Sequence, residues 1–120
     1  MQLTLADRLT NQGELYGSAL TLSATDLFNQ GDVSGDDLHL TLQDGLHNRG
    51  LVSGSKQVQL EASQVYQRGS LESRNLQVQA NTLDNQGTML GVDALTFAIR
   101  DTARNQGKLL SQGTSTLTAN

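Results

Sequence analysis

The sequence predicts an all-β protein, a parallel β-helix of about six turns with roughly 18–20 residues in each turn. Three observations lead to this fold class. The triplet Asn-x-Gly returns at a nearly constant interval, apolar and polar residues alternate between triplets, and aromatic residues make up only 3% of the chain. An ordinary compact core for these 120 residues would have to consist almost wholly of Leu, Val and Ala. A fold that stacks copies of one small unit is the better solution.

The triplet marks the start of each repeat. It reads Asn-x-Gly in five copies and Gln-Arg-Gly in one, with starts at Asn11, Asn29, Asn48, Gln67, Asn85 and Asn105. The residue numbers of successive starts differ by 18, 19, 19, 18 and 20. A nearly constant period of this kind is typical of solenoids, in which each repeat packs only against its neighbours.

Each repeat carries the pattern of β-strands. An apolar residue follows each Gly by two positions, and a small residue comes two positions later. An alternating stretch such as Leu38-x-Leu40-x-Leu42 follows, and another apolar residue, from Leu9 to Ala103, stands two positions before the next triplet. Alternation is the period of a half-buried strand. Stacking at about 4.8 Å would pile Leu22, Leu40 and Leu60 in a line inside a column roughly 30 Å long. The last copy is degraded, at Ser115-x-Leu117-x-Ala119.

The triplets are predicted to form a corner. Asn and Gly both tolerate positive φ, which suits a tight bend. A ladder of hydrogen-bonded amides is expected along the stack at Asn11, Asn29, Asn48, Asn85 and Asn105. Gln67 has one methylene more than Asn, so we expect it to interrupt this ladder and to make its turn locally the weakest.

Two other repeat architectures fit the sequence less well. A leucine-rich repeat has a similar period, but the second half of each unit here is another strand rather than a helical return segment. An ice-binding solenoid needs unbroken Thr-x-Thr rows, and four interior repeats lack them. The parallel β-helix remains the prediction.

Composition excludes several classes of function. Eight basic and twelve acidic residues give a net charge of −4, which argues against a nucleic-acid partner. The chain has no Cys, so disulfides, thiolate metal sites and Cys nucleophiles are excluded. Membrane insertion is not expected, because no apolar run approaches the roughly 20 residues of a membrane span.

The sequence predicts neither a metal or cofactor site nor an enzyme. His39 and His47 fall at different positions of the repeat, and the acidic residues around Asp36 lack the ligand order of known calcium loops. No repeat position stacks paired carboxylates for hydrolysis, and no Ser/His/Asp set can be assembled.

One surface feature is a candidate binding patch. The residue before each triplet follows an inward-facing one and should point outward, and three successive copies are Phe28, His47 and Tyr66. Their rings are expected about 4.8 Å apart. They form either a stack that stabilises the corner or a platform facing a sugar or receptor. Arg49 and Arg68 are expected over or beside these rings.

The repeat Asn-x-Gly-x-[Leu/Val]-x-[Gly/Ser], then Leu-x-Leu-x-Ala, then Leu-x-Asn-x-Gly resembles the haemagglutinin repeats of filamentous haemagglutinin-type exoproteins. The resemblance covers essentially all 120 residues. Such proteins include bacterial adhesins and the stalks of contact-dependent growth inhibition toxins. It implies a right-handed β-helical fibre, exported through an outer-membrane two-partner-secretion transporter to the surface of a Gram-negative bacterium. A receptor or glycan on a host or neighbouring cell is the implied partner.

We therefore expect residues 1–120 to be one β-helical segment of a larger secreted exoprotein, either an adhesive fibre or a toxin stalk. The sequence starts within a strand pattern at Gln2–Leu5, and neither end shows the polar cap of a free solenoid. End-to-end self-association of the isolated chain is accordingly expected.

Overall fold

The computed structural model describes residues 2–5 and 7–119, with side chains through Gly113. All regular structure in that part of the chain is β-strand, and no helix long and apolar enough to cross a membrane occurs there. The eleven strands are β1 (Gln2–Thr4), β2 (Leu9–Asn11), β3 (Glu14–Tyr16), β4 (Ala19–Asn29), β5 (Asp32–Asn48), β6 (Leu51–Glu61), β7 (Gln64–Gln67), β8 (Ser70–Asn85), β9 (Thr88–Asn105), β10 (Lys108–Ser111) and β11 (Thr114–Ala119).

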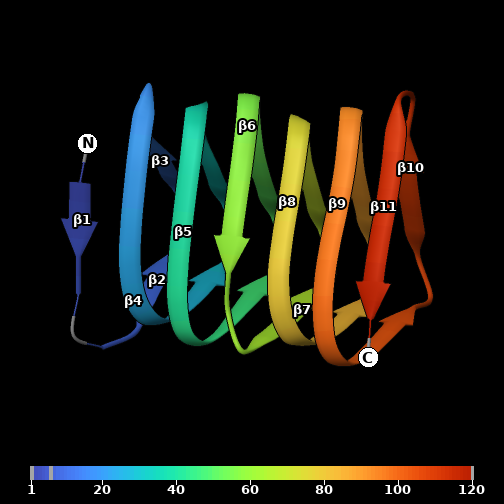
Figure 1. The fold of residues 1–120 in the computed structure, drawn as a ribbon. Coiled ribbons are helices and arrows are strands. Elements are labelled where there is room, and N and C mark those ends of the chain that lie inside the picture. Colours follow the sequence, from blue (N-terminus) through green and yellow to red (C-terminus); the bar gives the residue numbers. More distant parts are fainter. Residues whose placement is uncertain (1, 6, 120) are drawn as a thin grey trace.

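Every strand pair is parallel and joins residues one repeat apart. Leu22 pairs with Leu40, Leu40 with Leu60, Leu60 with Val78, and Val78 with Phe97. Figure 1 shows the turns side by side in chain order, with the termini at opposite ends of the stack. The predicted fold class, an all-β solenoid of about six stacked turns, is confirmed.

The core is the column of inward-facing apolar side chains. Buried members are Leu20, Leu22, Ala24, Leu27, Val33, Leu38, Leu40, Leu42, Leu46, Val52, Val58, Leu60, Val65, Leu71, Leu76, Val78, Ala80, Leu83, Met89, Leu95, Phe97 and Ile99. Ala103 departs from the pattern. It was expected to close the fifth repeat as an inward residue, but it is exposed, because no later strand among the described residues pairs with the end of β9. The side chains of Ser115, Leu117 and Ala119 lie outside the described ones.

The expectation of positive φ at the triplet corner is wrong. No described residue, glycine or other, has a positive φ. Glycine is needed there because successive turns approach closely. A Cβ added at Gly31 would overlap the carbonyl oxygen of Gly13, and that oxygen accepts the N–H of Asp32 at 2.8 Å. The same overlap recurs at Gly50, Gly69, Gly87 and Gly107.

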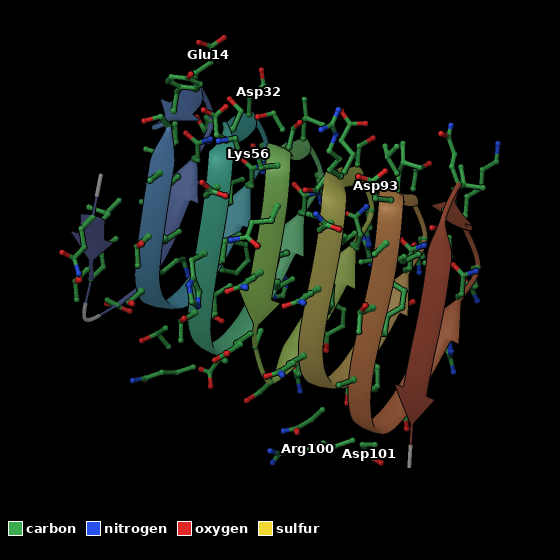
Figure 2. The ribbon with its side chains drawn as sticks, turned by 45° about the horizontal axis from the view of Figure 1, so that its top comes forward. Glu14, Asp32, Lys56, Asp93, Arg100 and Asp101 are labelled. Carbon is green, nitrogen blue, oxygen red and sulfur yellow. The ribbon has the colours of Figure 1, made fainter. Side chains whose placement is uncertain are left out.

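The variation of the period comes from the two other corners of each turn. One corner joins the small residue to the alternating stretch, and it is one residue longer at Gly54–Gln57 and at Gly91–Ala94. The next corner is longer at Leu42–Gly45 and at Ile99–Thr102. The shortest turns have neither extension, the intermediate ones have one, and the longest turn has both. Figure 2 shows Lys56 and Asp93 at one corner and Arg100 and Asp101 at the other.

Candidate functional site

The amides of the triplets are hydrogen-bonded to one another across the first four turns. Asn11 Nδ2 donates to Asn29 Oδ1 at 2.9 Å, and Asn29 donates to Asn48 at 2.9 Å. Asn48 then donates to Gln67 Oε1 at 2.6 Å. Each of these nitrogens also donates to a backbone carbonyl of the following turn, as Asn29 does to Leu51 at 3.0 Å. Both amide protons are therefore used, which satisfies polar groups inside an otherwise apolar column.

The series of amides is broken between Gln67 and Asn85. Gln67 Nε2 donates to the carbonyls of Gly69 at 2.9 Å and Thr88 at 2.8 Å. Asn85 Oδ1 is buried and has no hydrogen-bond partner among the described residues. The series resumes where Asn85 donates to Asn105 at 2.8 Å. The longer Gln side chain carries its amide too far along the corner to reach the next Asn.

Phe28, His47 and Tyr66 lie on the outside of this corner as a stack of three rings. The centroids of Phe28 and His47 are 4.3 Å apart with parallel planes, and those of His47 and Tyr66 are 5.0 Å apart at 17°. The Tyr66 hydroxyl donates to Gln64 Oε1 at 3.1 Å. His47 is covered on both faces by its two neighbours, so it exposes mainly its edge.

Guanidinium groups surround the stack. Arg8 lies over the Phe28 ring, with its Cζ 4.4 Å from the centroid. Arg49 and Arg68 border the open side of the rings, where a groove of about 370 Å³ also meets Gln30. Partial burial lowers the pKa of His47, and Arg8, Arg68 and Arg49 act in the same direction, whereas Asp26 opposes them. The groove is thus a locally cationic site on an acidic protein.

A second hollow, of about 400 Å³, lies at the corner that follows the alternating stretch. The longer corners at Leu42–Gly45 and Ile99–Thr102 flank it, and the two shorter corners between them form its floor with Ala62 and Ala80. The residues that line it include one acidic side chain, Glu61, and one basic side chain, Arg100.

The remaining sequence candidates are not brought together. His39 is exposed on the outer face of β5, in a different column from His47, and Asp36 accepts a hydrogen bond of 2.7 Å from Ser55. No group of three or more His, Asp or Glu side chains in the described part of the chain is arranged to hold a metal ion.

Two features of the surface were missed from the sequence. Arg8 completes the ring stack, and the only sequence signal for it was a cation in the turn before Phe28. The second hollow follows from unequal corner lengths, whose trace in the sequence is the uneven spacing of the triplets.

Comparison with known proteins links the chain to one group. It is 41% identical over 117 residues to deoxyribonuclease CdiA of Dickeya dadantii (strain 3937), a match that covers 93% of this chain. It is 40% identical over 119 residues to tRNA nuclease CdiA of Escherichia coli (strain NC101), covering 95% of this chain. A protein named toxin CdiA from Escherichia coli is 40% identical over 92% of this chain.

No family model matches the chain, and no solved structure does. The matched segment makes up only 4% of the length of each of these three relatives. The chain is thus related to the CdiA proteins, and the similarity covers nearly all of this chain but only one short segment of each CdiA protein.

Proposed function

We propose that the chain is a β-helical stalk segment of a contact-dependent growth inhibition toxin, in which it acts as a rigid spacer. The observation that carries the proposal is the continuous parallel register from β1 to β11 in a segment with CdiA relatives. Each turn extends the stack by about 4.8 Å and packs only against its neighbours. Length can therefore be set by the number of turns.

The toxic activity lies elsewhere in this proposal. Two of the relatives are named as nucleases, and the segment shared with them is 4% of their length. Among the described residues, the two hollows reported above are bordered by no paired carboxylates suited to hydrolysis. The chain should leave DNA and tRNA uncleaved when it is incubated with either.

Export and location follow the same proposal. The parent protein would leave the cell through an outer-membrane two-partner-secretion transporter and stand on the outer surface of a Gram-negative bacterium. The absence of Cys suits this route, because a chain without disulfides can pass a narrow pore unfolded.

A second role, recognition of a surface on a host or neighbouring cell, is favoured by one observation. The groove beside Phe28, His47 and Tyr66 combines ring edges with Arg49 and Arg68 on successive turns. An adhesive fibre would bind its receptor through such a groove on its side, and the stacked turns of the β-helix would give the fibre its length.

Deletion of one whole turn in the full-length toxin tests the spacer role. Removal of residues 85–104 joins equivalent corners and leaves the aromatic groove intact, so inhibition of neighbouring cells should persist. Removal of residues 85–94 is the matched control, because half a turn brings outward-facing residues into the core column and should abolish inhibition. A whole-turn deletion that is exported and folded but no longer inhibits would contradict a spacer role.

A further inference from the structure

We infer that the groove beside Phe28, His47 and Tyr66 binds an acidic oligosaccharide through the sugar's carboxylate groups. The inference deepens the second role proposed above, surface recognition, and rests on it. It concerns the chemical class of the ligand, which the geometry of the rings and arginines restricts.

The stacking of the rings argues against recognition of neutral sugars. Neutral sugars pack their C–H groups on the face of an aromatic ring. Here both faces of His47 are covered by its neighbours, and Arg8 lies over Phe28 from the preceding turn. Phe28 and His47 therefore present their edges to the groove, and ring edges carry the positive end of the aromatic quadrupole, which suits an anion.

The charges at the groove point the same way. Arg49 and Arg68 stand at equivalent positions of successive turns, since Asn48 pairs with Gln67 in the parallel register. Strands in register are about 4.8 Å apart, so two guanidiniums border one short groove. Guanidinium groups bind carboxylates with two parallel hydrogen bonds. Because Asp26 acts on His47 from nearby and the chain carries a net charge of −4, a singly charged carboxylate is favoured over a doubly charged phosphate.

The backbone around the groove favours a sugar over a peptide. The N–H groups of Arg49 and Arg68 are already used, donating to Asn29 and Asn48 carbonyls at 2.8 Å. An extended peptide that adds a strand needs free backbone donors as well as acceptors, and the N–H groups at these positions are occupied. A ligand must bind through side chains such as Gln30 and the arginines, which suits a molecule rich in hydroxyls. The groove volume of about 370 Å³ is at the lower end of small-molecule sites.

The repeat itself supplies the variant that tests this inference. Gln occupies the middle of the triplet at Gln12, Gln30, Gln86 and Gln106, so the double variant Arg49→Gln/Arg68→Gln is compatible with the fold. Lys56→Gln/Arg100→Gln is the matched control, because it removes the same charge from exposed sites outside the groove. Far-ultraviolet circular dichroism verifies that both remain folded.

Titration calorimetry with a tetragalacturonate, a neutral cello-oligosaccharide and a tetraglutamate as probes gives the readout. We expect the tetragalacturonate to bind the parent chain and the control variant equally, and the groove variant at least tenfold more weakly. If the groove variant bound the tetragalacturonate as tightly as the parent chain does, the inference would be overturned. Binding of the cello-oligosaccharide or the tetraglutamate to the parent chain with the same affinity would also overturn it.

Attachment of the fluorescently labelled chain to bacterial cells separates this inference from the role on which it rests. Attachment that depends on Arg49 and Arg68, without binding of the tetragalacturonate, would refute the ligand class and leave surface recognition standing. Absence of attachment by the parent chain would refute both.

Discussion

Asn48 donates a hydrogen bond of 2.6 Å to Gln67, and Gln67 directs its own amide nitrogen to two backbone carbonyls instead of to Asn85. Asn85 Oδ1 is left buried without a partner among the described residues. One additional methylene thus divides the amides of the corner into two separate runs. The fourth turn is therefore expected to be locally the weakest of the stack.

Replacement of Gln67 by Asn is expected to join the two runs. The variant Gln67→Asn should gain about 0.5–1.5 kcal/mol in free energy of unfolding, because Asn85 Oδ1 acquires a donor. Amide hydrogen exchange of residues 67–72, expected to be the fastest along the corner in the parent chain, should slow in the variant. Gln86→Asn is the control, since Gln86 is exposed and outside the amide series. Equal protection along the corner of the parent chain would contradict the prediction.

Gly50 and Gly13 occupy the same repeat position and should respond differently to Ala. A Cβ at Gly50 would overlap the carbonyl oxygen of Gly31, whereas a Cβ at Gly13 meets no atom within 4 Å. Gly50→Ala should lower the free energy of unfolding by about 1–3 kcal/mol, because the turns must separate. Gly13→Ala should change it by less than ~0.5 kcal/mol. Chemical denaturation of the two variants measures the difference, and equal values would disprove the close-approach argument.

The folded chain should be less stable in mild acid than at neutral pH. Because burial lowers the pKa of His47 in the folded state, the unfolded chain binds a proton more readily. The free energy of unfolding should therefore be constant above the ordinary pKa of about 6.5 and fall as the pH drops from there through the lowered value.

Thermal unfolding of His47→Phe across this pH range isolates the effect. The variant keeps a ring between Phe28 and Tyr66 and should lose that part of the pH dependence. His39→Gln serves as the control, since His39 is exposed in another column. A parent chain whose unfolding temperature does not change between pH 7 and pH 5 would refute the prediction.

The three corners should differ in their tolerance of an inserted residue. One Ser inserted after Asn81 lengthens a short corner to the length seen at Ile99–Thr102, so stability should fall by less than ~1 kcal/mol. One Ser inserted after Arg49 lies within the triplet and misaligns the amides and glycines of two turns. That variant should lose cooperative unfolding in circular dichroism melts. Comparable melts for both insertions would show that the corners are equivalent.

Periodicity was sufficient to predict which residues share a column. Leu22, Leu40 and Leu60 are aligned because alternation and a fixed triplet together determine both the direction and the register of a side chain. The alignment of Phe28, His47 and Tyr66 followed from the same reasoning.

Local backbone geometry could not be predicted in the same way. Propensity suggested positive φ at the triplet, but the need for Gly comes from the carbonyl of a residue one turn away, a contact that no local pattern encodes. Likewise, the length of a repeat does not reveal which corner holds the extra residue. Arg8 was missed because its contact with Phe28 depends on the rotamer of a long, flexible side chain.

The triplet corner keeps its length in every turn, while the other two vary by one residue. A corner that is one residue longer leaves the pairing register of the strands after it unchanged. The triplet corner is therefore restricted to one length, whereas each of the other two corners can hold one residue more. Related segments should therefore differ mainly in the lengths of these two corners, while the rise of each turn along the axis stays the same.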